Sequence, residues 1–462
     1  MAPKFGTSGL RGLVTELTPD LVSDHTRAFL AACDIGAGLC IGQDLRPSSP
    51  RIARDIIAAA RAENVRVIDC GALPTPALAL AARHHGAAAI MVTGSHIPAD
   101  RNGLKFYSRT GEITKADEAA ISMALGRAPG SAEGSLETDA AAAARFVERY
   151  VTACGPTALG GRRIGIYAHS AVGRDDLATI LASIGAEVVE IGRSETFIPV
   201  DTEAVDGETR QRIAAWVADM GLDALVSTDG DSDRPLLADE TGAIVPGDVM
   251  GQITAELLHA KCVVTPISSN SGVTRKGFDR VDTTRIGSPF VIAGMEDAGG
   301  DVVGYEANGG FLLGFRAEGP AGPLDPLPTR DCMLPLIMTL LSAGTGKLSS
   351  RIAQEPPVVT MADRLQEVAQ EASQPFVAAL RESAAARADF LFGLGAEEVG
   401  CDLTDGVRMQ LKDDRIVHIR PSGNAPELRL YVEAGSRSAA ESLMQTGLVL
   451  LRQAVLGRHA VG

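Results

Sequence analysis

The sequence predicts an α/β protein in which three tandem mixed-sheet α/β domains and a C-terminal α+β domain surround a central cleft. Its 462 residues are enough for about three or four domains. An alternation of short apolar runs with helical patterns recurs three times, and it stops near residue 358. We place the four domains at residues 1–150, 151–246, 247–355 and 356–462.

In the first two domains strand-like runs alternate with helical patterns, which is typical of mostly parallel sheets. In the first, strands are expected at residues 39–42, 65–70 and 88–92, with helices at residues 50–63 and 76–85. In the second, strands are expected at residues 164–168, 187–191 and 224–228, with one helix ending near residue 185 and another at residues 210–220. Helices between successive strands favour parallel pairing in both domains.

The third domain continues this pattern and the fourth departs from it. The third combines expected strands at residues 262–267 and 302–306 with expected helices at residues 248–259, 289–298 and 329–341. Pro- and Gly-rich stretches predict a loop at residues 319–328 and a linker at residues 342–358. A long helix is then expected at residues 364–387, before short strands joined by tight turns and a closing helix from residue 439.

Charge and cysteine content exclude several classes of protein. A formal net charge of −15 argues against a general nucleic-acid-binding or anionic-membrane surface. The 7 cysteines are dispersed and form no CxxC pair, so neither a disulfide framework nor a zinc site is indicated. No apolar run approaches membrane-spanning length, and no signal core opens the sequence. We therefore expect a cytoplasmic protein.

The segment Asp229-Gly-Asp-Ser-Asp-Arg234 places three carboxylates at alternate positions, and this pattern indicates a site for a hard cation. Carboxylates this close repel one another unless a divalent ion neutralises them. The same spacing occurs at the start of an EF-hand loop, but the sixth position there requires glycine, and Arg234 followed by Pro235 occupies it. A solvated acidic turn is the other alternative.

The segment from Thr93 to Lys105 contains a candidate nucleophile, Ser95, next to His96. A serine hydroxyl is a weak nucleophile without a base or a metal, and a phosphorylated serine would offer oxygens to a cation in the acidic loop. This segment could equally be an ordinary turn stabilised by the Asn102-Gly103 dipeptide.

Three further loops carry groups that bind phosphates or sugars. Residues 420–429 combine two arginines with a serine, an amide and exposed backbone N–H groups, which suits a phosphate monoester; a hairpin with solvated arginines is the alternative. Residues 304–310 offer the carboxylate of Glu306 and the amide of Asn308 to sugar hydroxyls. Residues 5–12 offer Ser8 and Arg11 on a glycine-rich turn. Taken singly, the last two loops could also be plain turns.

Three of these loops follow strand-like runs, at Thr93, Asp229 and Glu306. Ligands of open α/β sheets bind beyond the carboxyl ends of the strands, so we expect one loop from each domain to face a shared cleft.

Together, in this order, the five loops resemble those of the α-D-phosphohexomutase superfamily, and above all its phosphomannomutase/phosphoglucomutase members, over essentially the whole chain. The resemblance implies a phosphoserine at Ser95 and one Mg²⁺ per chain, held by Asp229, Asp231, Asp233 and a phosphoserine oxygen. It also implies reversible conversion of hexose 1-phosphate to hexose 6-phosphate, of mannose and also of glucose, through a hexose 1,6-bisphosphate that serves as activator. The substrate would be a phosphorylated hexose, and the protein a monomer or homodimer that binds neither nucleic acid nor membrane.

The resemblance also implies roles for individual residues. Arg11 and Lys105 would neutralise the reacting phosphate, beside Ser8, and Glu306 with Asn308 and Arg234 would contact the sugar. The distal phosphate would be bound by Arg420, Ser422, Gly423, Asn424 and Arg429. Lys105 is our first candidate for the general base and His96 the second, although His96 could equally serve only to order the loop.

This chain departs from the family pattern at several positions. Ile97 stands where members usually carry asparagine. Asn308 and Gly310 stand where the better-studied bacterial enzymes have serine and histidine, and Ser288 stands where they often have histidine. These departures leave the general base and the exact sugar open, so a phosphoglucosamine mutase or a phosphoglucomutase is an alternative. Separate alternatives are a metal-dependent phosphatase and a catalytically silent sugar-phosphate-binding protein.

Overall fold

The computed structural model describes residues 3–6, 9–422 and 427–456. The chain forms two compact units. Unit 1 consists of Met1–Val264 and Gly287–Gln354, and unit 2 consists of Thr265–Ile286 and Glu355–Gly462. No helix in the described part of the chain is long and apolar enough to cross a membrane.

The first sheet of unit 1 has the strand order β1-β2-β6-β5-β3-β4-β8, with β7 paired to β6. Strands β3, β4, β5 and β8 run parallel to one another, whereas β6 pairs antiparallel with β5 and β2 pairs antiparallel with β6. The strands are β1 (Lys4–Phe5), β2 (Leu10–Leu13), β3 (Leu39–Gln43), β4 (Val67–Ala72), β5 (Ala88–Val92), β6 (Arg101–Ser108), β7 (Gly111–Glu112) and β8 (Leu136–Thr138). The helices are α1 (Pro19–Ala32), α2 (Ser49–Ala62), α3 (Thr75–His85), α4 (Lys115–Met123) and α5 (Ala142–Cys154).

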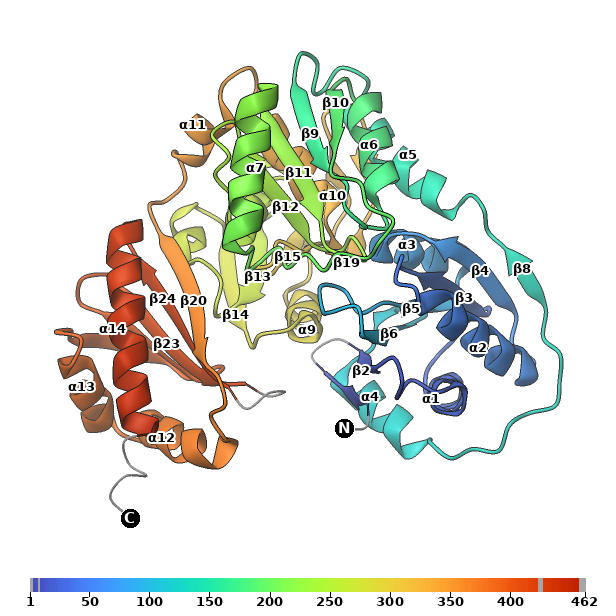
Figure 1. Ribbon diagram of the computed structural model, residues 1–462, viewed down its shortest axis with the longest axis horizontal. Coiled ribbons are helices and arrows are strands. Elements are labelled where there is room, and N and C mark those ends of the chain that lie inside the picture. Colours follow the sequence, from blue (N-terminus) through green and yellow to red (C-terminus); the bar gives the residue numbers. More distant parts are fainter. Residues whose placement is uncertain (1–2, 7–8, 423–426, 457–462) are drawn as a thin grey trace. The chain divides into compact units, whose positions relative to one another are not determined.

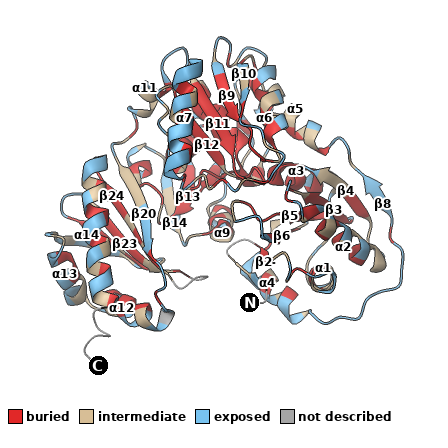
Figure 2. Cartoon of the chain, in the orientation of Figure 1, coloured by how far each residue is buried: buried red, intermediate tan, exposed pale blue. Residues whose placement is uncertain are grey.

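The second sheet has the order β10-β9-β11-β12, in which only β12 is antiparallel. Its elements are β9 (Arg163–Tyr167), α6 (Arg174–Ser183), β10 (Glu187–Ile191), α7 (Gly207–Met220), β11 (Ala224–Thr228) and β12 (Pro235–Asp239). Every residue of β11 and β12 is buried, whereas one side of α7 is exposed (Figure 2). Helix α7 begins where the side chain of Asp206 accepts a hydrogen bond from the backbone of Thr209, and it ends at Gly221, which has φ +60°.

The third sheet of unit 1 joins β13 (Cys262–Pro266), β15 (Val302–Tyr305), β16 (Phe311–Leu313) and β19 (Leu327–Asp331). Unit 1 includes β13 only as far as Val264. The helices nearby in the chain are α8 (Gly247–Leu257), α9 (Ser288–Ala298), α10 (Met333–Ser342) and α11 (Leu348–Ile352), and β17 (Ala317–Glu318) pairs with β18 (Pro323–Leu324). Residues 329–331 therefore form a strand, and the helix expected at residues 329–341 was wrong over its first turn. The expected loop at 319–328 contains β18, and the expected linker contains α11.

Unit 2 has an antiparallel sheet of order β20-β24-β23-β22-β21. The strands of this sheet are β20 (Val359–Leu365), β21 (Glu398–Asp402), β22 (Val407–Leu411), β23 (Ile416–Pro421) and β24 (Leu428–Ala434). Unit 2 also contains the strand β14 (Arg280–Thr284), which lies outside this sheet. Its helices are the 3₁₀ helix η1 (Ser271–Arg275), α12 (Gln370–Glu382), α13 (Ala384–Phe392) and α14 (Arg437–Leu456), and all these elements are drawn in Figure 1. The single helix expected at residues 364–387 was wrong: the segment begins in β20 and continues as two helices.

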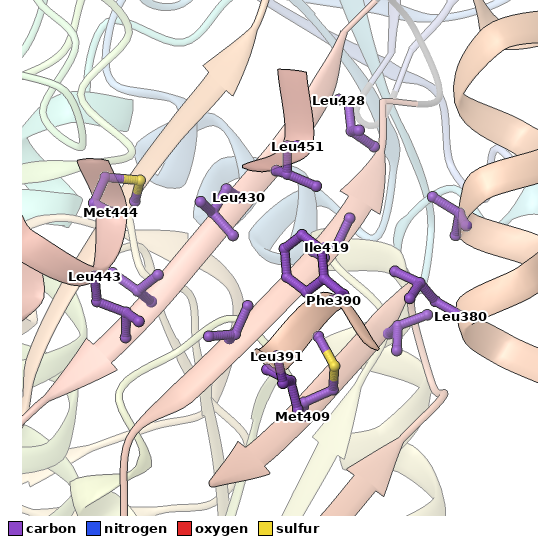
Figure 3. Packing of buried hydrophobic residues seen from close by; sticks show 14 of the residues in the cluster. Leu380, Phe390, Leu391, Met409, Ile419, Leu428, Leu430, Leu443, Met444 and Leu451 are labelled. Atoms are coloured by element: carbon purple, nitrogen blue, oxygen red, sulfur yellow. The ribbon is translucent and has the colours of Figure 1, made fainter. Parts of the chain in front are cut away.

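One face of this sheet packs against helices, as Figure 3 shows. Leu428 and Leu430 of β24 and Ile419 of β23 contribute to a buried cluster with Leu443 and Leu451 of α14. Burying each leucine stabilises the fold by roughly 1.5–3 kcal/mol. Because side chains alternate along a strand, the residues between these leucines lie on the opposite face of the sheet.

Candidate active site

The backbone at Ser95 is held in an unusual conformation directly after β5. Ser95 is fully buried and has φ +53°, a left-handed conformation that few residues other than glycine adopt. Its backbone N–H donates to Thr93 Oγ1 at 2.8 Å, and Thr93 in turn donates to Asp44 Oδ2 at 2.7 Å. Such conformations persist where the surroundings fix them, and they are common at functional sites.

Arg46, from the turn after β3, fixes this loop, and sequence analysis missed it. The guanidinium is fully buried against Asp44 Oδ2 at 3.2 Å. It donates to four backbone carbonyls, those of Ser95 (2.8 Å), Ile97 (2.5 Å), Pro98 (2.7 Å) and Arg101 (2.9 Å). A Cβ atom at position 94 would lie 2.6 Å from Arg46 Cζ, so glycine is required there. A buried charge with this many acceptors orders the loop around Ser95.

The acidic loop lies between β11 and β12. Asp229, Asp231 and Asp233 are completely buried, and they offer carboxylate oxygens that all lie within 4.8 Å of one another. Ser95 Oγ donates a hydrogen bond to Asp229 Oδ2 at 2.5 Å. A Cβ atom at Gly230 would lie 2.8 Å from the carbonyl oxygen of Ser95, so the two loops are in close contact. The structure thus brings together the candidate nucleophile and the candidate metal ligands.

Lys105 completes this cluster. It lies on β6 rather than in a loop, and its Nζ is 2.5 Å from both Asp231 Oδ2 and Asp233 Oδ2. Burial, followed by the charges of Asp231 and Asp233, raises the pKa of Asp229 well above its usual value. Burial also acts to raise the pKa of Asp231, but the adjacent ammonium of Lys105 outweighs it and the net shift is downward. The pKa values of two neighbouring carboxylates in one cluster are thus shifted in opposite directions.

The donor set fits a hard divalent cation. Asp231 Oδ1 and Asp233 Oδ1 are buried, and neither has a hydrogen-bond partner in the described part of the chain. Such oxygens are costly to bury without a partner, and Mg²⁺ and Ca²⁺ prefer oxygen ligands of this kind. The cluster can therefore hold a metal ion.

His96 contacts both Ser95 and Arg234. Its Nδ1 lies 3.3 Å from Ser95 Oγ and 2.9 Å from Arg234 Nη1. Because a guanidinium can only donate, Nδ1 must be an acceptor in the second contact. Burial, with the positive charge of Arg234 next, lowers the pKa of His96 to about 3. The nitrogen nearest Ser95 is thus already engaged, which favours an ordering role for His96.

Arg11 adds positive charge from β2, where it pairs with Gly103 of β6. Burial, followed by the charges of Arg234 and Arg330, lowers the pKa of Arg11 to about 10. Three guanidinium groups from distant parts of the sequence therefore affect one another in the same region of unit 1. A concentration of cations of this kind is suited to an anionic ligand. Ser8, the other candidate on this turn, lies outside the described residues.

The candidate sugar loop joins β15 to β16. The amide of Asn308 donates to Glu306 Oε2 at 3.1 Å, and Asn308 Oδ1 accepts from the backbone of Gly310 at 3.0 Å. Gly309 has φ +85°, and its backbone N–H donates to the carbonyl of Glu306 at 2.9 Å. Asn308 therefore orients the Glu306 carboxylate. Arg330 of β19 lies 3.5 Å from the same Oε2 atom, a contact that sequence analysis did not anticipate.

The candidate phosphate loop belongs to unit 2. Arg420 pairs with Asp405 at 2.8 Å, Arg429 pairs with Glu427 at 3.4 Å, and the backbone of Ser422 donates to the carbonyl of Glu427 at 2.9 Å. Gly423 and Asn424 lie outside the described residues.

Arg429 stands directly opposite Arg420 on one side and Arg364 on the other, across β23, β24 and β20. Two carboxylates offset part of the repulsion within this row, because Asp405 pairs with Arg420 and Glu427 contacts both Arg429 and Arg364. Three positive charges against two negative ones still favour binding of an anion. Arg364 was missed because its segment was expected to be helical.

Comparison with known proteins places these observations in a family. Residues 2–128 match the family model for phosphoglucomutase/phosphomannomutase, alpha/beta/alpha domain I, residues 144–242 match domain II, and residues 364–446 match the C-terminal domain. A phosphomannomutase of Sinorhizobium fredii is 45% identical, covering 99% of this chain and 100% of the relative. The chain belongs to the α-D-phosphohexomutase superfamily. The resemblance inferred from the sequence is confirmed.

Further similarities support this assignment. A phosphomannomutase of Salmonella muenchen is 40% identical, covering 96% of this chain and 94% of the relative. A solved phosphoglucomutase/phosphomannomutase family protein from Burkholderia thailandensis aligns with a TM-score of 0.79 at 21% identity, covering 97% of each chain. A Thermus thermophilus protein aligns with a TM-score of 0.75 at 23% identity, covering 98% of this chain and 99% of that one. These two structures confirm the α/β fold class.

Proposed function

We propose that this phosphohexomutase interconverts the 1-phosphate and 6-phosphate of a hexose, preferably mannose and also glucose, through a phosphoserine at Ser95. One observation carries the proposal: the Ser95 hydroxyl is 2.5 Å from Asp229, inside a buried cluster of three carboxylates and Lys105. The names of the two most identical relatives described above, both phosphomannomutases, support mannose as the sugar.

In the proposed reaction Ser95 Oγ gives its phosphoryl group to a sugar hydroxyl and later receives the other phosphate of a hexose 1,6-bisphosphate. A Mg²⁺ ion held by Asp229, Asp231, Asp233 and a phosphoserine oxygen would supply charge neutralisation when bound. As the ammonium that contacts Asp231 and Asp233, Lys105 neutralises the reacting phosphate together with Arg11. Lys105 remains the first candidate for the general base, a role that it fills only after it has given up a proton. The bisphosphate also serves as activator.

The remaining residues orient the substrate. Glu306, held by Asn308, accepts hydrogen bonds from sugar hydroxyls. Arg234, on which the charge of Glu306 acts, orders His96. Arg420, Ser422, Gly423, Asn424 and Arg429 bind the phosphate that is not reacting, and Arg364 adds to their charge. The four-domain division at residues 150, 246 and 355, the cytoplasmic location and a monomeric or dimeric state remain predictions.

Phosphate release separates a mutase from a phosphatase. Ser95 has no exposed surface, so a sugar hydroxyl as well as water reaches it only after the surrounding residues move. A mutase must exclude water while its bisphosphate reorients, whereas a phosphatase must admit it.

The direct test is an assay with the 1-phosphates of mannose, glucose and glucosamine, in the presence of Mg²⁺ and a hexose 1,6-bisphosphate. We expect that every sugar phosphate that is isomerised will require Ser95, and that mannose 1-phosphate will give the highest kcat/KM. Ser95→Ala should abolish turnover, whereas Ser131→Ala, at an exposed position, should leave it unchanged. Phosphate release without isomerisation would indicate a phosphatase, and binding without turnover would indicate a silent binding protein.

A further inference from the structure

Arg330 joins the acidic loop to the sugar loop. It lies on β19 and only 3% of its surface is exposed. Its Nη2 is 3.0 Å from Asp233 Oδ2, and its Nη1 is 3.5 Å from Glu306 Oε2. One guanidinium therefore lies between a candidate metal ligand and the candidate sugar-binding carboxylate.

The stem of Arg330 occupies the space beside Gly310. A Cβ atom at position 310 would lie 2.8 Å from both Cγ and Cδ of Arg330. Since β16 and β19 are adjacent antiparallel strands, the arginine reaches across from β19 to a position where the sugar loop has no side chain of its own. The glycine makes room for the arginine, and a larger residue at 310 would displace it.

The position of the guanidinium matters because both of its partners are buried. Asp233 has no exposed surface and Glu306 is only 5% exposed. Two buried carboxylates next to the same site repel each other unless a cation lies between them. A planar guanidinium can donate to both at once, which a point charge such as an ammonium does less well.

We propose that Arg330 is a positioning residue that couples the metal-binding loop to sugar recognition. It orients Glu306 for the sugar hydroxyls and neutralises part of the charge of Asp233, so it competes with the cation while it favours the anionic substrate. This inference rests on the proposed function, and it adds a residue from β19 to the site. Loss of the charge should therefore change cation binding and sugar binding in opposite directions.

The test uses the full-length protein, two variants of Arg330, one control variant and a Glu306→Gln background. Arg330→Met keeps a long unbranched side chain and removes the charge. Arg330→Lys keeps the charge but replaces the planar guanidinium, which can donate to two carboxylates at once, by an ammonium. Arg316→Met is the matched control, because Arg316 forms an exposed pair with Asp325. Binding of Mn²⁺ to the substrate-free protein is titrated by electron paramagnetic resonance, and KM for mannose 1-phosphate is measured separately.

For Arg330→Met we expect Mn²⁺ to bind about threefold or more tightly, while KM for the sugar phosphate rises about tenfold. Arg330→Lys should keep the Mn²⁺ affinity of the unmodified protein within twofold and raise KM by a smaller factor. In a Glu306→Gln background, Arg330→Met should raise KM much less, since Arg330 acts through Glu306.

Unchanged KM and Mn²⁺ affinity in Arg330→Met would overturn the proposal. Parallel weakening of both, with a lower melting temperature, would show a merely structural role and would overturn it as well. If Arg330→Met does not fold, an unchanged KM in Arg330→Lys decides against the proposal. Absence of isomerisation in the unmodified protein would instead count against the proposed function, and the Mn²⁺ titration would still test the charge effect.

Discussion

The guanidinium of Arg46 donates a hydrogen bond to the backbone carbonyl of Ser95 at 2.8 Å, although 49 residues separate them in the chain. The same group lies 4.0 Å from the ring centroid of Phe197, a residue whose ring also approaches the glycine of the acidic loop. Arg46 thus contacts both the loop of the candidate nucleophile and an aromatic side chain packed against Gly230 of the acidic loop. Its removal should affect the relative position of the two loops.

We expect Arg46→Lys to lower kcat about 100-fold with little change in KM, because an ammonium cannot serve four carbonyls and the Ser95 loop loses its position. The free energy of unfolding should fall by about 2–4 kcal/mol as buried carbonyls lose their donor. Steady-state kinetics and urea unfolding measure these effects. Arg54→Lys, at an exposed position on α2, is the control and should change neither. Normal kcat in the Arg46 variant would show that the loop does not depend on this arginine.

Replacing Asp231 by asparagine tests the cation cluster. The amide has the shape of the carboxylate and can still contact Thr75, whose hydroxyl donates to Asp231 Oδ2 at 2.5 Å, so the fold should persist. One charged ligand is lost, and turnover should fall by about 10³-fold with weaker Mn²⁺ binding. Circular dichroism, kinetics and metal titration check the three parts. Asp219→Asn, on the exposed end of α7, should behave like the unmodified protein. Near-normal turnover with unchanged metal dependence in Asp231→Asn would refute the metal assignment.

The arginine row of unit 2 should bind phosphate. Arg429→Ala should raise KM for the sugar phosphate about tenfold or more, since it removes the central charge of the row. Arg364→Ala should raise KM by a smaller factor, because the Arg364 side chain is half exposed. Arg437→Ala on α14, an exposed helix position, serves as control. Unchanged KM and kcat in Arg429→Ala would rule out its phosphate role.

Acid should weaken unit 2 through His418. Burial lowers the pKa of His418 to about 4, although the carbonyl of Asp405 accepts a hydrogen bond from the ring at 2.5 Å. In the unfolded chain the pKa of a histidine is near 6.5, so His418 binds a proton there at a pH at which it stays neutral in the folded chain. The stability contribution is complete above about pH 6.5 and is lost as pH falls towards 4, by at most about 3 kcal/mol.

Hydrogen exchange of the β23 amides measures this loss locally. Protection should fall between pH 6.5 and 4 after correction for intrinsic exchange rates, and the fall should be reduced in His418→Gln. An equal pH dependence in the variant would assign the effect to other groups.

Much of the architecture followed from local pattern. Buried strands such as β5 are short, continuous apolar runs, and α7 begins and ends at Asp206 and Gly221, which are residues typical of helix caps. Ligands of open α/β sheets bind beyond the carboxyl ends of the strands, and from this we expected the loops after β5 and β11 to lie close together. They do, since Ser95 contacts Asp229.

Residues 359–365 and 327–331 were harder to assign. Both segments become strands by pairing with distant strands, and nothing in their own composition outweighs the helical pattern that follows them. Arg364 and Arg330 were missed for this reason. Arg46 was missed because its role depends on carbonyl groups about 50 residues away, which no local pattern records.

In the proposed reaction Ser95 carries the phosphoryl group beside the aspartate cluster. Intact-mass analysis of the protein after incubation with a hexose 1,6-bisphosphate and Mg²⁺ measures this modification. We predict one added phosphoryl group, mapped to Ser95 by fragmentation, absent from Ser95→Ala and discharged by mannose 1-phosphate. Isomerisation of the sugar phosphate by a protein that never carries phosphate on Ser95 would rule out the phosphoserine mechanism.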